Sequence, residues 1–97
     1  YDASAWSGIH VCVKADGIDV RMKVINPGFG GTGQEHGYTF AGSGSWLCLQ
    51  LSWTELTQPD WVSPKTPIDP QHIIQIQFQA DESNQPFDFC VDRLEFY

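Results

Sequence analysis

A chain of 97 residues is long enough for one small domain, and we expect residues 1–97 to form a single one. Hydrophobic residues make up 41% of the chain and aromatic residues 13%, a content that excludes a disordered protein. The net charge of −7, from 12 acidic against 5 basic residues, excludes nucleic acid and anionic lipid as partners and suits a neutral ligand. No apolar run approaches the length of a membrane span, so no membrane association is expected.

Six β-strands are predicted, and the first three lie in the first 40 residues. Residues 9–15 and 19–25 alternate apolar with polar side chains, and the short link between them contains Asp-Gly, a hairpin signal. Residues 26–37 hold five glycines and a proline and are predicted to be a loop. This loop lacks the lysine and the following helix of a phosphate-binding loop. Residues 38–40 form a short third strand.

The second half of the chain contributes the other three strands. Residues 45–53 are the longest alternating run, with the leucines and Trp53 on one face. Residues 54–70 contain four prolines and form a crossover loop, with one helical turn at residues 69–72. Residues 74–79 and 87–96 are the fifth and sixth strands. Because apolar residues never recur at helical spacing over three turns, the chain is predicted to be all-β.

Four stretches, in order, resemble the jelly-roll carbohydrate-binding modules of bacterial cellulases, including families eleven and thirty and the small modules of family eighty-one. The stretches are residues 1–14, residues 53–61 (Trp-Thr-Glu-Leu-Thr-Gln-Pro-Asp-Trp), residues 68–79 (Ile-Asp-Pro-Gln-His-Ile-Ile-Gln-Ile-Gln-Phe-Gln) and residues 87–96 (Phe-Asp-Phe-Cys-Val-Asp-Arg-Leu-Glu-Phe). The pattern is also shared by domains of the complex I assembly factor type.

The resemblance implies a reduced jelly-roll β-sandwich of two antiparallel sheets, without the two strands with which the family pattern begins. In that wiring the first, fourth and sixth strands share a sheet with the first in the middle, and the second, third and fifth share the other. The chain begins inside the family pattern, so we expect it to have been excised from a longer protein or to be an unusually short member. A shortened sandwich would leave strand edges exposed, which favours a homodimer.

The function that the resemblance implies is non-catalytic binding of β-glucan: cellulose, cello-oligosaccharides, mixed-linked glucan or xyloglucan. The domain would target an appended glycoside hydrolase to the plant cell wall, and the protein would be secreted. The alternative is a protein-interaction domain of the complex I assembly factor type without affinity for sugar. An enzyme is not expected, because no facing pair of carboxylates, nucleophile elbow or histidine metal motif can be identified.

The expected ligand-binding residues combine planar polar groups with aromatic rings. Amides and a guanidinium hydrogen-bond paired sugar hydroxyls, and an aromatic ring stacks on the C–H face of a sugar. Three glutamines share one face of a strand. The alternative is a solvated sheet face on which glutamines only maintain solubility. The candidates are Arg21, Tyr38, Trp46, Gln75, Gln77, Gln79, Trp6 and Trp61.

The tryptophans have alternative interpretations. Trp53 is in phase with the inward leucines and belongs to the core. Trp61 lies in a loop bounded by prolines. It either covers an edge of the sandwich as a lid or forms an exposed stacking surface, and the family pattern favours the lid. Trp6 and Trp46 either stack on sugar or cover an exposed sheet edge.

The outward faces of the first, fourth and sixth strands each carry one cysteine. The family often has tryptophan at the positions of Cys12 and Cys90, so a Cys12–Cys90 disulfide is one explanation, closing a loop of about 80 residues. Cysteines that remain unpaired as small apolar residues are another. Zinc is a third, because His10 shares this face, although the usual short ligand spacing is missing.

A structural Ca²⁺ is implied by the resemblance, because Asp92 stands where the family uses an aspartate of the closing strand as a ligand. Arg93 replaces the second aspartate of the family and lowers the local negative charge. Ca²⁺ requires six to eight oxygen ligands, so Asp92 would need help, and Asp2 is the expected partner.

Overall fold

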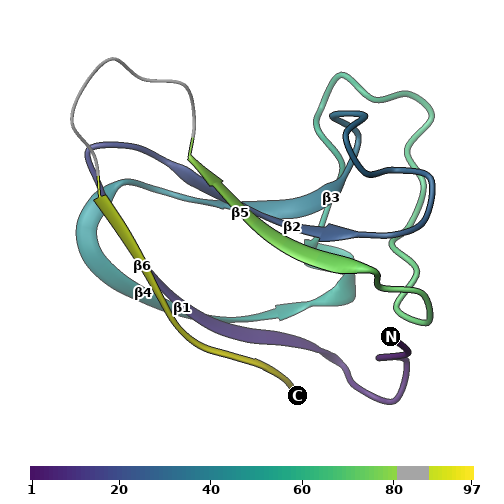
Figure 1. Cartoon of the computed structure of the whole chain (residues 1–97), viewed down its shortest axis with the longest axis horizontal. Helices are drawn as coiled ribbons and strands as arrows, with labels where there is room; N and C mark the ends of the chain where they lie inside the picture. Colours follow the sequence, from purple (N-terminus) through teal and green to yellow (C-terminus); the bar gives the residue numbers. More distant parts are fainter. Residues whose placement is uncertain (81–87) are drawn as a thin grey trace.

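The computed structural model describes residues 1–80 and 88–97, and within them the chain is a β-sandwich of two three-stranded antiparallel sheets (Figure 1). This confirms the all-β fold class. The elements are β1 (Gly8–Asp16), β2 (Val20–Ile25), β3 (His36–Phe40), β4 (Ser43–Ser52), the 3-10 turn η1 (Trp53–Glu55), β5 (Gln75–Ala80) and β6 (Asp88–Phe96). Phe87, predicted as the start of the last strand, lies outside the described residues.

The strand order is the one that the jelly-roll wiring predicts. One sheet has the order β4-β1-β6 and the other β3-β2-β5, so β1 and β2 are the central strands. The central strands carry the most deeply buried rows, because neighbours cover them on both sides. On β1 the row includes Ile9, Val11 and Val13, and on β2 it includes Val20, Met22 and Val24. The alternation of residues 9–15 and 19–25 predicts that the apolar row of each strand faces inward, and all six residues are buried.

Side-chain hydrogen bonds shape two features of the segment that runs from η1 to β5. Trp53 packs against the core as predicted, and its Nε1 donates to the Trp6 carbonyl at 2.7 Å. The predicted helical turn at residues 69–72 is a single hydrogen-bonded turn, in which Asp69 Oδ1 accepts from the Gln71 backbone N–H at 2.9 Å. An aspartate that binds the backbone two residues on closes a turn without a helix.

A β-bulge interrupts β6 where the sequence suggested simple alternation. The register with β1 shifts between the pairs His10–Glu95 and Cys12–Asp92, and Arg93 has a φ of 55°. An additional residue in the left-handed conformation is typical of a bulge and reverses the direction of the side chains that follow. Phe96 therefore faces inward, next to Trp53 and stacked on Tyr1 at 5.2 Å.

The disulfide joins Cys12 to Cys48, so the Cys12–Cys90 pairing considered as one explanation is wrong, and so is the alternative of three unpaired cysteines. Cys12 and Cys48 are direct partners across β1 and β4, with Cα atoms 4.0 Å apart. Cys90 pairs instead with Lys14, one side-chain row away from Cys12, and its thiol is free and exposed. The three cysteines do share the outward face of this sheet, but the register determines which two bond.

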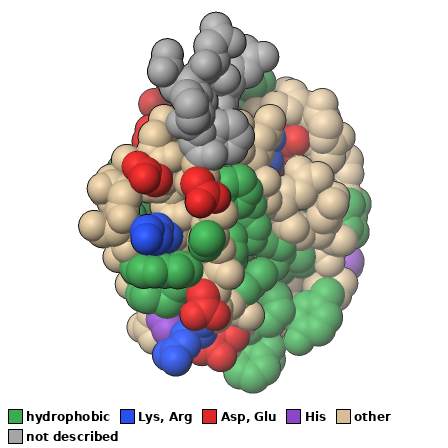
Figure 2. Space-filling view, turned by 60° about the vertical axis from the view of Figure 1, so that its left-hand side comes forward, with side chains coloured by type: hydrophobic (Ala, Val, Ile, Leu, Met, Phe, Trp, Pro, Cys, Tyr) green, Lys and Arg blue, Asp and Glu red, His purple; other side chains and the backbone are tan. Residues whose placement is uncertain are grey.

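Several large hydrophobic side chains are exposed at the surface of the sandwich. Among the described residues the most exposed are Tyr1, Trp61, Ile74 and Trp46. Figure 2 shows a continuous band of hydrophobic side chains that runs beside a group of acidic and basic ones. Among the described residues there is no helix with the length and apolar character needed to cross a membrane.

Candidate functional site

The outward face of the β3-β2-β5 sheet gathers most of the predicted polar site residues. In the register of β2 and β5, Arg21 lies opposite Gln79 and Lys23 opposite Gln77. Gln75 continues the same row, opposite Ile25. The three glutamines are exposed, because alternation turns the apolar residues of β5 toward the core. The sheet register thus places amide groups beside cationic groups on one surface.

The glycine-rich segment 26–35, between β2 and β3, forms a wall beside this face. Its anchor is Glu35, which is buried with a side-chain exposure of 4%. One oxygen of its carboxylate accepts from the Gly31 backbone N–H at 3.1 Å and lies 4.0 Å from Lys23 Nζ. A buried carboxylate must be paired and hydrogen-bonded, and here both conditions are met. The pair fixes the loop on the sheet and neutralises the lysine.

A shallow groove of about 600 Å³ lies between this loop and β5. Its lining combines one ion pair, two amides and glycine backbone: Lys23, Gly31, Gly33, Glu35, Gln77, Phe78 and Gln79. Two of the predicted glutamines are therefore in the groove. The third, Gln75, lies outside it on the same strand face.

The Arg21 side chain connects two loops beside this face. One of its guanidinium nitrogens donates to the carbonyls of Glu35, at 3.2 Å, and Thr57, at 2.8 Å. The guanidinium thereby holds the end of the glycine loop to the segment after η1. The guanidinium N–H groups that we had expected to bind a sugar therefore already donate to backbone carbonyls.

Trp61 lies beside Gly33 of the glycine loop, next to the groove but outside its lining. A methyl group placed on Gly33 would come within 3.6 Å of the Trp61 ring, and the tryptophan is 66% exposed. The lid interpretation favoured by the family pattern is therefore wrong for most of its surface. An exposed indole next to a polar groove has the geometry of a stacking surface.

The structure separates the other predicted aromatic residues from the groove. Tyr38 pairs with Met22 on the inner face of the sheet and packs edge-to-face on Phe40, so its expected place beside the glutamines is wrong. Trp46 is exposed on the opposite sheet, across from Lys14. Trp6 lies in the N-terminal segment, beside Trp53.

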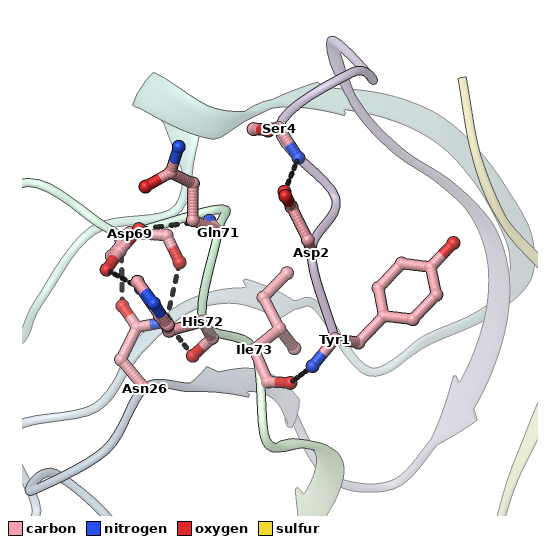
Figure 3. A network of polar contacts seen from close by, with 8 residues as sticks. All are labelled: Tyr1, Asp2, Ser4, Asn26, Asp69, Gln71, His72 and Ile73. Carbon is pink, nitrogen blue, oxygen red and sulfur yellow. Dashed lines mark hydrogen bonds and ion pairs between the residues drawn. The ribbon is translucent and has the colours of Figure 1, made fainter.

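The two aspartates expected to bind calcium occupy separate surroundings. Asp2 belongs to the polar network at the N-terminus, where hydrogen bonds from the side chain and backbone of Ser4 lower its pKa (Figure 3). Asp92 pairs with Cys12 in the middle of β6. Across residues 1–80 and 88–97, no three histidine, cysteine or acidic side chains are grouped as a metal site requires. The described residues therefore group no zinc ligands around His10, and calcium binding by Asp92 and Asp2 stays a prediction.

A buried asparagine organises the network in Figure 3. The Asn26 amide nitrogen donates to the carbonyls of Asp69 and His72, at 2.8 and 2.9 Å, and its oxygen accepts from the Asp69 N–H at 2.8 Å. His72 binds the Asp69 carboxylate at 2.7 Å, and this hydrogen bond is the main cause of a lowered pKa for Asp69. The carboxylate and imidazole are exposed, so they serve the turn before β5.

A second hollow, of about 340 Å³, lies between the segment after η1 and residues 65–68. Its walls include Leu56, Pro67 and Ile68. Lys65 is the only charged side chain among the described residues that line it. Lys65 itself donates to the carbonyls of Asp60 and Val62, at 3.1 and 3.2 Å. This hollow offers shape to an apolar group but few polar partners.

The groove residues that were not predicted are Lys23, Gly31, Gly33, Glu35 and Phe78. The alternation predicted in residues 19–25 puts Lys23 on the polar, outward face, as the structure has it, but nothing in the sequence connects Lys23 with Glu35, 12 residues later. The only signal was the glycine-rich composition of the loop, which permits a close approach of backbone to ligand or sheet.

Comparisons with known proteins leave the groove as the main guide to function: no protein-family model, no curated protein and no solved structure matches this chain.

Proposed function

We propose that this domain binds a neutral β-glucan chain without cleaving it, in the groove beside β5. The observation that carries the proposal is the pairing of two exposed amides, Gln77 and Gln79, with the exposed Trp61 at the border of the same groove. Amides match the vicinal hydroxyls of a sugar, and the indole matches its C–H face. The resemblance to cellulase-associated modules supports glucan as the sugar.

The charge of the groove favours a neutral ligand. The Lys23 ammonium lies 4.0 Å from the buried Glu35 carboxylate, so neither charge is left for an ionic ligand. The remaining lining is amide, glycine backbone and Phe78. An anionic polymer would also meet a chain whose net charge is −7.

We expect Gln77→Ala, Gln79→Ala and Trp61→Ala each to weaken binding of a soluble β-glucan by about 1–3 kcal/mol, since each removes one hydrogen bond or stacking surface. The melting temperature should hardly change, because all three side chains are exposed. Calorimetric titration and affinity gels would measure binding. Gln50→Ala, an exposed glutamine on the opposite sheet, is the matched control and should bind normally.

The proposal is wrong if no β-glucan retards the wild-type protein in affinity gels. Unchanged affinity in all three variants would move the site elsewhere, with Trp6 and Trp46 as the next candidates. Release of reducing sugar by the purified domain would contradict the non-catalytic role.

In its biological setting, the domain would be joined to a glycoside hydrolase and secreted, bringing the enzyme to plant cell-wall glucan. The Cys12–Cys48 disulfide supports an oxidising compartment, where such bonds form and persist.

The second candidate function is a protein-interaction domain, and one observation favours it. Tyr1 is 69% exposed and Ile74 61%, and exposed apolar surface of this kind marks contact sites between proteins. A pull-down on insoluble cellulose, with soluble glucan as competitor, separates the two functions. A carbohydrate-binding domain is retained and then released by the competitor, whereas an interaction domain passes through.

Calcium remains a prediction from the resemblance. If the ion is bound, EDTA should lower the melting temperature by several degrees, because a ligand that only the folded state binds stabilises that state. Asp92→Asn should then abolish the effect of EDTA, while Asp88→Asn on the same strand should preserve it. An EDTA-treated sample that melts unchanged and contains no calcium by elemental analysis would end this prediction.

A further inference from the structure

β5 is an edge strand with an open side. Within the described chain it pairs only with β2, which leaves the hydrogen-bonding groups of its other edge without a strand partner. Natural proteins protect such edges with charges, prolines or bulges, because an open edge readily adds another strand. β5 reads Gln-Ile-Gln-Phe-Gln-Ala and has none of these protections.

The other edges differ from β5 in this respect. β6 carries Asp88, Asp92, Arg93 and Glu95 and is interrupted by its bulge. β3 is covered at Gly37 by a bridge to Thr57. β4 is uncharged, but its register with β1 shifts near Asp16 and Gly44 has a φ of 79°, so its first part is irregular. β5 is the uncharged edge with a regular register along its whole length.

The sequence around β5 is symmetric about Gln77. If two copies pair antiparallel with Gln77 opposite Gln77, then Gln75 faces Gln79 on the outward side. On the inward side, Ile76 faces Phe78, and Ile74, directly before the strand, comes opposite Ala80. Every outward pair is amide with amide, and every inward pair is apolar with apolar. Directly opposed side chains are the unit that stabilises such a pairing.

The burial of these residues matches an uncovered edge. Ile76 and Phe78 are only half-buried, although both pack against the core. Ile74 directly precedes β5, its backbone N–H donates to the Ile25 carbonyl at 2.9 Å, and its side chain is 61% exposed. A strand placed beside β5 would cover all three.

We infer that β5 is the contact surface for a second copy of this chain, which adds antiparallel across a two-fold axis at Gln77 and joins the two β3-β2-β5 sheets into one. A two-fold contact requires a surface complementary to itself, and the symmetric pattern of β5 satisfies this requirement. An unrelated strand would have to reproduce that pattern by chance. Gln77 and Gln79 also line the proposed glucan groove, so the two grooves would meet at the joined edge.

Analytical ultracentrifugation of the whole chain tests the inference through mass, independently of sugar binding. Wild-type protein should sediment as a dimer that dissociates on dilution. Gln77→Lys sets two like charges directly opposite each other and should raise the dissociation constant about tenfold or more. Because Gln77 is exposed, the circular dichroism spectrum should stay that of the wild type, and the melting temperatures should agree at concentrations at which both proteins are monomeric. Gln50→Lys, on the uncharged edge strand β4, should dimerise normally.

Charge complementation supplies the sharper measurement. Gln77→Lys mixed with Gln77→Glu should form a mixed dimer more tightly than either variant dimerises alone, because opposite charges then meet at the axis. A wild-type chain that stays monomeric at all concentrations overturns the inference. So does a dimer that Gln77→Lys leaves intact, or one that Gln50→Lys disrupts instead. Loss of glucan binding with a normal dimer would contradict only the proposed function.

Discussion

Replacing Cys12 and Cys48 together with alanine is expected to lower the free energy of unfolding by about 3–4 kcal/mol, the loop-closure value for a bond that spans some tens of residues. The two cysteines are separated by 36 positions in the sequence. The bond restricts the unfolded chain, and it also ties edge strand β4 to the central strand β1. For a domain of this size the loss is a large share of the total stability.

The measurement is equilibrium unfolding in urea, with and without a reducing agent. Cys90→Ser is the matched control, because it removes a cysteine from the same sheet face without breaking the bond. Its stability should equal that of the wild type, and reduction should destabilise both proteins equally. Peptide mapping that finds Cys90 in a disulfide with Cys12, together with a destabilised Cys90→Ser variant, would show that the other pairing forms.

Asn26→Ala is expected to lower the free energy of unfolding by about 2–4 kcal/mol, because it leaves several backbone groups without the hydrogen bonds that the amide makes. Asn26 is only 4% exposed and holds the Asp69–His72 turn to the end of β2. The same turn leads into Ile73, whose N–H and carbonyl bond to Tyr1 at the N-terminus. Loss of the amide should therefore loosen the turn and the N-terminal segment together.

Urea unfolding and amide hydrogen exchange would measure this effect. Exchange at the Asp69 and Ile73 backbone N–H groups should accelerate more than exchange in β1. Gln71→Ala is the control, since it lies in the same turn with an exposed side chain and should cost little. Asn26→Asp keeps the acceptor for the Asp69 N–H but places a carboxylate against two carbonyls, so it should not restore stability. An Asn26→Ala variant as stable as the wild type would contradict the role of this residue.

The strands and their faces could be predicted because alternation is a local property. The alternation around Val11 and Val13, or around Val20 and Met22, shows within a few residues which face is apolar. Burial of that face drives folding. The order of strands in the sheets followed from the resemblance to a known wiring. The sequence patterns of β1, β2 and β5 are regular, and there the predicted faces agree with the structure.

The candidate site was only partly predictable. The Gln77 and Gln79 amides were identified because they share one face of one strand. The wall of the groove was not, because the contact between Lys23 and Glu35 depends on the path of a glycine-rich loop that has no periodic signal. Arg21 was assigned to a ligand, but the structure gives its guanidinium to backbone carbonyls that only the folded loop brings near.

The local pattern of residues was enough to predict the all-β class, the inward rows of the central strands and the shared outward face of three cysteines. The folded structure was needed to show that Cys12 bonds to Cys48, that Tyr38 faces inward and that Trp46 lies on the sheet opposite the glutamines. Alternation along a strand fixes which face a residue occupies. Register across strands fixes its neighbours, and one bulge residue, Arg93, changes that register and turns Phe96 into the core.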